Sequence, residues 1–113
     1  MTYEELVLKV RDVYEYADAR EVYEHVAVQV NVTGEAAGAF YIEIANRQVC
    51  VEPYDYHDRD ALVTADTSAI LSVLDGSLDY KTAISSGVFH VDGNPDKIAL
   101  FNKVKLSKRK KHK

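Results

Sequence analysis

The fold is decided by residues 76–101, which read GSLDYKTAISSGVFHVDGNPDKIALF. Three glycines punctuate this stretch at points where the backbone must turn. Gly76 closes an amphipathic helix, Gly87 leads into a short strand over residues 88–91, and Asp92-Gly93 turns the chain into a last helix. That helix has a strong start, because Asn94 is a capping residue and proline, at position 95, suits the first helical position. The stretch therefore predicts a helix end, a short helix, a strand and a helix in succession.

The residues before this stretch begin with a helical pattern and then change to the period of a strand. Thr2 and Glu5 form a capping-box pattern, and apolar residues at helical spacing predict a helix over residues 2–18. From Val22 the apolar period becomes two, and strands are expected over residues 26–32, 40–45 and 48–52. A turn at Asn46-Arg47 joins the last two of these strands, which predicts a three-stranded antiparallel meander.

Two further segments link the meander to residues 76–101. Residues 61–65 are expected to form a short strand, and Asp66 or Thr67 caps the helix that ends before Gly76. Asp79 can likewise cap a helical turn or two that runs through Ile84. The order of elements predicts a single domain over residues 1–106.

The charge of the chain is unevenly distributed. Residues 1–107 contain nine Lys and Arg against eighteen Asp and Glu, a balance of −9, whereas five of the fourteen cationic side chains lie in residues 108–113. An acidic body argues against a specific nucleic-acid partner. The basic tail, residues 107–113, has nothing to bury and is predicted to be disordered. Transient contact with an anionic membrane surface is one role for this tail, and a solubilising end is the other.

The cysteine content and the N-terminus bear on location. Cys50 is the single cysteine, so no internal disulfide can form, and its place in a strand favours a buried, inert thiol over a nucleophile. The first residues lack the basic and apolar pattern of a signal peptide, and no apolar run is long enough to span a bilayer. A cytoplasmic location is therefore expected.

The residues from Asp60 to Leu106 carry a resemblance to a known family. The run Asp60-Ala61-Leu62-Val63-Thr64, the helix to Gly76, and then Ala83, Gly87, Phe89, Val91, Gly93, Asn94 and Ile98-Ala99-Leu100-Phe101 are similar to the sterol carrier protein 2 family. The resemblance implies an α+β fold with a five-stranded, mainly antiparallel sheet whose one face is covered by helices. It also implies an apolar tunnel between the two layers that holds a fatty acid, a fatty acyl-CoA, a sterol or a similar lipid.

A lipid-binding cavity requires apolar walls that leave space between the layers. The candidate wall residues are Phe40, Ile42, Ile44, Ile70, Leu74, Phe89, Ile98 and Phe101. For any single one of them ordinary core packing is the more common role, since every sheet-and-helix domain needs such apolar stripes. Tyrosines near the mouth are candidates to meet the polar end of a ligand, although the sequence does not say which ones. The expected partner is a small hydrophobic ligand.

Two alternatives to a carrier remain open. In the first, the cavity is filled by side chains and the domain is a structural module that forms a homodimer or binds another protein through its exposed sheet face. In the second, the loop over residues 54–60 uses His57 and Asp58 in catalysis on a hydrophobic substrate. Its spacing fits no standard zinc or calcium pattern, and a solvated loop is the more common reading. No catalytic residue, metal or cofactor is therefore expected, and the chain is not predicted to be an enzyme.

Overall fold

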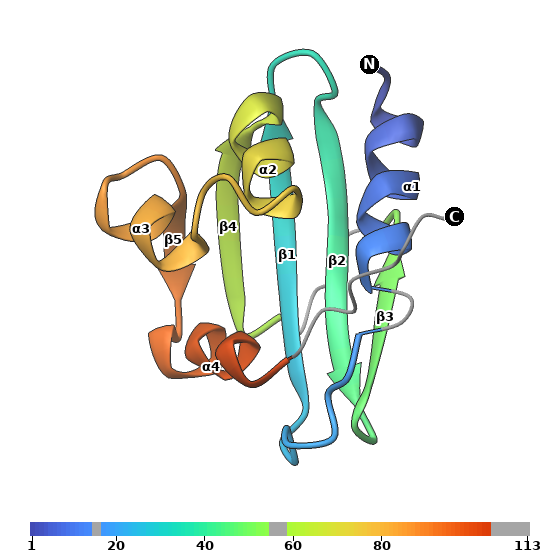
Figure 1. Ribbon diagram of the computed structural model, residues 1–113, viewed down its shortest axis with the longest axis vertical. Helices are drawn as coiled ribbons and strands as arrows, with labels where there is room; N and C mark the ends of the chain where they lie inside the picture. The colour runs from blue at the N-terminus through green and yellow to red at the C-terminus, as the bar shows by residue number, and fades with distance from the viewer. Residues whose placement is uncertain (15–16, 55–58, 105–113) are drawn as a thin grey trace.

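Five strands form one mixed sheet in the order β3-β2-β1-β4-β5 (Figure 1). The computed structural model describes residues 1–14, 17–54 and 59–104. The central strand β1 pairs antiparallel with β2 and parallel with β4, and the other two pairs are antiparallel. The strands are β1 Val26–Thr33, β2 Gly38–Ala45, β3 Gln48–Glu52, β4 Ala61–Asp66 and β5 His90–Gly93. The prediction of a five-stranded, mainly antiparallel sheet is confirmed.

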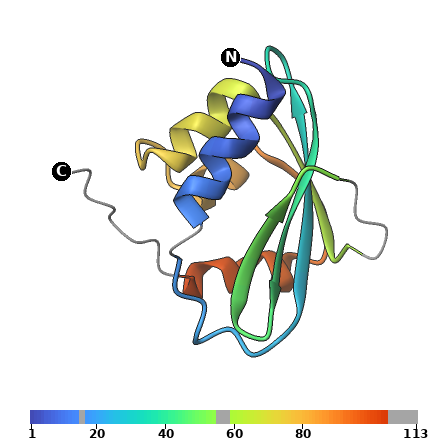
Figure 2. The ribbon, with the colours of Figure 1, turned by 90° about the vertical axis from the view of Figure 1, so that its right-hand side faces the viewer.

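The helices lie on one face of this sheet (Figure 2). They are α1 Tyr3–Tyr14, α2 Thr67–Leu74, α3 Tyr80–Ser85, α4 Pro95–Ala99 and the 3₁₀ turn η1 Leu100–Lys103. The core lies between the two layers, where Leu6 and Val10 of α1 and Phe40 of β2 are almost fully buried. Over the described ranges, none of the helices is long and apolar enough to cross a bilayer.

The predicted helix starts are formed by the side chains that the sequence indicates. Thr2 and Glu5 form the capping box, in which the Thr2 N–H donates to Glu5 Oε1 at 2.8 Å and the Glu5 N–H donates to Thr2 Oγ1 at 3.1 Å. Of the two candidates for the α2 cap, Asp66 is the one used, and it accepts from the Ala69 N–H at 2.8 Å. Asp79 caps α3 in the same way.

The turn between β2 and β3 also follows from its two residues. Asn46 and Arg47 have φ values of 52° and 62°, the left-handed conformation at both central positions of a two-residue hairpin. This turn places Val49 and Val51 of β3 beside Ile44 and Ile42 of β2. The predicted meander is therefore present with the expected register of inward-facing residues.

The first helix is shorter than predicted. It ends at Tyr14, and neither Ala17 nor Asp18 is helical, so the predicted end at residue 18 is wrong. The Ala17 N–H donates to the Tyr14 carbonyl at 3.1 Å, which closes a turn rather than continuing the helix. Ala19 and Val22 are 2% and 1% exposed. Burying Ala19 and Val22 requires the chain to leave the axis of α1. The strand β1 then begins at Val26, as predicted.

The last strand lies two residues further along than predicted. It covers His90–Gly93 instead of residues 88–91, because the Phe89 N–H donates to the Ala83 carbonyl of α3 at 2.9 Å. Val88 is 45% exposed and packs into neither layer. Gly93 belongs to the strand and pairs with Ala61 of β4, so the turn predicted at Asp92-Gly93 is wrong. The N–H of the next residue, Asn94, donates to the Asp60 carbonyl at 3.0 Å.

Candidate functional site

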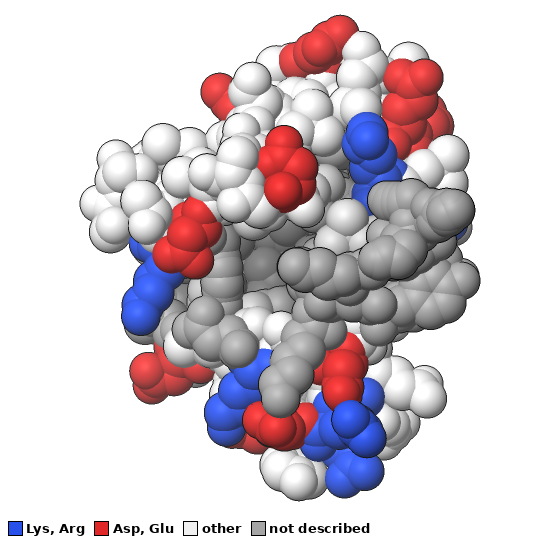
Figure 3. Space-filling model, viewed as in Figure 1, with Lys and Arg blue, Asp and Glu red and all other residues white. Residues whose placement is uncertain are grey.

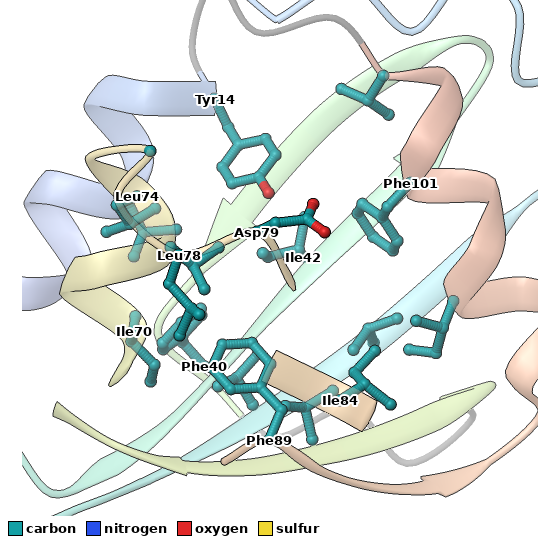
Figure 4. Close-up of a pocket in the computed structure, with 18 residues that line it drawn as sticks. Tyr14, Phe40, Ile42, Ile70, Leu74, Leu78, Asp79, Ile84, Phe89 and Phe101 are labelled. Carbon is teal, nitrogen blue, oxygen red and sulfur yellow. The ribbon is translucent and has the colours of Figure 1, made fainter. Parts of the chain in front are cut away.

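A cavity of about 380 Å³ lies between the sheet and the helices. The face of the molecule that carries the helices is hollowed between α2 and α4, and coloured charged side chains lie around its edges (Figure 3). The cavity walls are almost entirely apolar and come from both layers (Figure 4). They consist of Val10, Tyr14, Val28, Val30, Phe40, Ile42, Val63, Ile70, Val73, Leu74, Gly76, Leu78, Asp79, Ile84, Phe89, Ile98, Phe101 and Val104.

The structure brings most of the predicted wall residues together around this cavity. Those that line it are Phe40, Ile42, Ile70, Leu74, Phe89, Ile98 and Phe101. Ile44 does not line it and is fully buried at 0% exposure. Ile44 shares the inward face of β2 with Phe40 and Ile42, but it lies near the turn to β3, where the core is packed. Alternation along a strand assigns a face, and it cannot tell a filled part of that face from an empty one.

Side-chain hydrogen bonds hold the helices over the sheet and thereby frame the cavity. Arg11 of α1 donates through Nε to the Val51 carbonyl at 3.0 Å, which ties α1 to the edge strand β3. The buried Thr67 hydroxyl at the start of α2 donates to the Thr33 carbonyl at 3.0 Å and accepts from the Ala36 N–H at 2.9 Å. Lys97 of α4 donates to the His25 carbonyl at 3.1 Å, just before β1. Three of the helices, α1, α2 and α4, are thus fixed to different strands or strand ends.

Tyr14, the last residue of α1, places a hydroxyl inside this apolar space (Figure 4). Burial raises the pKa of Tyr14 to about 12. Removal from water disfavours the charged phenolate, so the side chain stays neutral and remains a hydrogen-bond donor across the physiological pH range. Tyr14 is one of the tyrosines that the sequence could not assign to a position near the ligand.

The raised pKa of Tyr14 makes the stability of the protein sensitive to alkaline pH. The folded-state pKa exceeds the ordinary value of 10.0, so the contribution of the neutral phenol is complete below about pH 10 and is lost as the pH rises towards 12. Between about pH 9 and pH 12, we expect the wild type to lose about 2 kcal/mol of unfolding free energy relative to Tyr14→Phe. Urea denaturation of both proteins at each pH measures this difference. If the unfolding free energies of the two proteins change in parallel with pH, the Tyr14 hydroxyl titrates as it does in water.

The thiol of Cys50 is not buried, which corrects the prediction made from its position in a strand. Cys50 lies on the outward face of β3, and its side chain is exposed. Desolvation, together with the hydrogen bond that the thiol donates to Glu52 at 3.3 Å, raises the pKa of Cys50 above its ordinary value. A protonated thiol is a poor nucleophile, so desolvation and the hydrogen bond to Glu52 both work against a nucleophilic role for Cys50.

The structure also bears on the polar loop that sequence reasoning considered for catalysis. His57 and Asp58 lie outside the described residues. The carboxylate of Asp60 accepts a hydrogen bond from the Ala27 N–H at 2.8 Å, while the Asp60 N–H donates to the Ala27 carbonyl at 2.7 Å. These bonds join the start of β4 to β1, so the role of Asp60 is structural. In the part of the chain that the structure describes, no three His, Cys, Asp or Glu side chains form a metal-binding group.

Several residues of the cavity wall lie outside the set that the sequence predicts. Val28, Val30 and Val63 line the cavity as well, but they are not among the eight candidate wall residues of the sequence analysis. Asp79 was assigned only to the cap of α3, and it lies on the cavity wall as well. A helix cap involves residues that are close together in the sequence, so it can be predicted. Whether a residue lines a cavity depends on the distance between the sheet and the helices.

Comparisons with known proteins agree with this architecture. The family model described as the SCP-2 sterol transfer family matches residues 6–105. Among solved structures, sterol carrier protein 2 from Aedes aegypti in complex with palmitate is 20% identical, with a TM-score of 0.58, and the match covers 88% of this chain and 89% of that one. A protein described as UbiJ-SCP2 ubiquinone synthesis protein is 25% identical, with a TM-score of 0.59, over 74% of this chain and 70% of that one.

A larger enzyme contains a similar fold. The stereoselective inverting sec-alkylsulfatase Pisa1 from Pseudomonas sp. is 16% identical, with a TM-score of 0.67, over 82% of this chain. The present chain spans only 15% of the length of that sulfatase. No curated protein sequence matches. The family match over nearly the whole described domain, together with the five-stranded sheet covered by helices on one face, shows that this chain belongs to the SCP-2 sterol transfer family.

Proposed function

We propose that the domain binds an elongated hydrophobic ligand in the cavity between sheet and helices and carries it without chemical change. The observation that supports this proposal is the cavity itself, which has a volume of about 380 Å³ and walls from both layers. Ligand pockets commonly have volumes of about 300–1,000 Å³ and mainly apolar walls. Membership of a sterol transfer family and the palmitate complex of the mosquito protein support the same function.

The driving force for binding is the removal of apolar ligand surface from water. Burial contributes roughly 25 cal/mol per Å² before the cost of ordering the ligand is subtracted. The wall residues Ile42 and Ile98 are 9% and 7% exposed, so this part of the cavity wall is largely out of contact with solvent. The open volume also favours a carrier over a structural module with a filled cavity. Homodimer formation and membrane contact through residues 107–113 stay predictions of the sequence.

The carrier function is tested by native mass spectrometry of freshly purified protein and by titration with Nile red, an uncharged dye that fluoresces in apolar surroundings. We expect either a co-purified lipid of defined mass or saturable uptake of one dye molecule per chain. Extraction and identification of the bound molecules would then begin to name the cargo. Protein that carries no lipid and shows no saturable uptake of the dye would contradict the proposal and favour a structural or protein-binding module.

A further inference from the structure

The polar groups on the cavity wall differ from those expected of a fatty-acid site. Among the described residues that line the cavity, Tyr14 and Asp79 carry the only polar side chains, and none is lysine, arginine or histidine. Figure 4 shows their oxygen atoms among side chains that otherwise consist of carbon. A ligand carboxylate buried among these walls would lack the cation or the set of donors that normally compensates its lost hydration.

The Tyr14 hydroxyl is a hydrogen-bond donor on the cavity wall. Among the residues that the structure describes, its oxygen has no hydrogen-bond partner, and the side chain packs against the core cluster. Tyr14 is partly buried, and its hydroxyl faces apolar side chains. A donor without a partner in such surroundings is unfavourable, so an acceptor oxygen supplied by a ligand would gain a hydrogen bond there. A neutral phenol satisfies an alcohol or carbonyl oxygen as a simple donor.

Asp79 adds negative charge to the wall of the same cavity. It is exposed, and its Oδ2 accepts from both the N–H and the hydroxyl of Thr82, each at 3.3 Å. These bonds hold the carboxylate at the start of α3, beside the wall residue Leu78. A ligand carboxylate that entered this cavity would be repelled by Asp79, whereas an uncharged head group would not.

We propose that this cavity selects an uncharged single-chain lipid with an oxygen at its polar end, such as a long-chain alcohol or ester, over an ionised fatty acid of the same length. Tyr14 donates a hydrogen bond to the ligand oxygen, and Asp79 disfavours a second negative charge. This inference rests on the proposed carrier function and adds the chemical class of the cargo. The described cavity-lining residues offer one donor and one anion, which together match a neutral head group.

The test compares ligands that share a twelve-carbon chain and differ only at the polar end. Dodecan-1-ol, methyl dodecanoate and dodecanoate each displace Nile red from the wild-type protein at about pH 8, where a simple carboxylic acid is ionised. We expect the alcohol and the ester to bind at least about 10-fold more tightly than dodecanoate, because the carboxylate must lose its hydration among apolar walls and is repelled by Asp79. Dodecane serves as the reference without a polar end.

Two substitutions separate the two contributions. Tyr14→Phe removes the donor. It should lower the affinity for the alcohol and the ester about 5- to 10-fold and leave the affinity for dodecane unchanged. Asp79→Asn keeps a good capping residue and removes the charge. It should raise the affinity for dodecanoate several-fold and leave the affinity for the ester unchanged. Tyr41→Phe, on the outward face of β2, and Asp75→Asn, outside the cavity wall, are the matched controls. Unchanged melting temperatures would show that each variant is folded.

The outcomes distinguish this inference from the carrier function on which it rests. If none of the twelve-carbon compounds and no Nile red binds, the carrier function itself is wrong. If they bind, but dodecanoate equals or exceeds the alcohol, the selection of an uncharged head group is overturned while the carrier stands. An equal loss of affinity for dodecane and for dodecan-1-ol in Tyr14→Phe would also overturn the selection of an uncharged head group, because the substitution would then act through packing alone.

Discussion

The Ile42→Trp protein is expected to remain folded and to lose at least about 50-fold in affinity for Nile red, because the indole occupies the space that the ligand needs. Ile42 lies in the middle of β2, and its side chain lines the cavity (Figure 4). A larger side chain at this position extends into open volume rather than into packed neighbours. Fluorescence titration measures the affinity, and thermal unfolding measures the stability.

Two variants of the same strand serve as controls for Ile42→Trp. Ile44→Trp adds the same bulk to a fully buried position outside the cavity, so overpacking should destabilise it by about 1–3 kcal/mol or more. Tyr41→Trp, on the opposite face of β2, should bind the dye like the wild type. Wild-type affinity in a folded Ile42→Trp protein would mean that the dye binds elsewhere, and the proposed site would be wrong.

The largest loss of stability from a small substitution is expected at Gly93. Gly93 has a φ of +126°, and a Cβ at this position would lie 2.7 Å from both the Ala61 Cα and the Asp60 carbonyl oxygen. Both contacts are with backbone atoms, one in the first residue of β4 and one in the residue before it, and these atoms cannot move without disturbing the pairing of β4 with β5. Strain in the backbone and steric overlap together predict that Gly93→Ala lowers the unfolding free energy by about 3–5 kcal/mol. Urea denaturation measures the loss.

Gly76 provides the matched control for this prediction. Its φ of +86° is also unfavourable for other residues, but a Cβ at Gly76 would meet nothing within 4 Å. Gly76→Ala should therefore cost only about 1–2 kcal/mol, the penalty of the left-handed conformation alone. Equal losses in the two variants would show that the close approach of β5 to β4 contributes nothing and that conformation explains both.

Residues close together in the chain predicted most of the local structure. The capping box of Thr2 and Glu5, the caps Asp66, Asp79 and Asn94, and the turn at Asn46-Arg47 each involve residues within a few positions of one another. A cap or a turn is stabilised by its own side chains and backbone, so the sequence carries the information directly. The errors in local structure, at the end of α1 and in the place of β5, occur where burial or a long-range pairing overrides the local pattern.

The sequence by itself thus determined the family, the inward face of the three meander strands and the helix starts, since these depend on period and local chemistry. Only the tertiary structure decided that β4 runs parallel to β1, that Ile44 is excluded from the cavity, that Cys50 is exposed and that Tyr14 enters the apolar space. The contacts that set the distance between the layers join residues far apart in the chain, as Arg11 to Val51 and Lys97 to His25 do. The cavity exists because of the distance between the sheet and the helices, and no single segment of the sequence determines that distance.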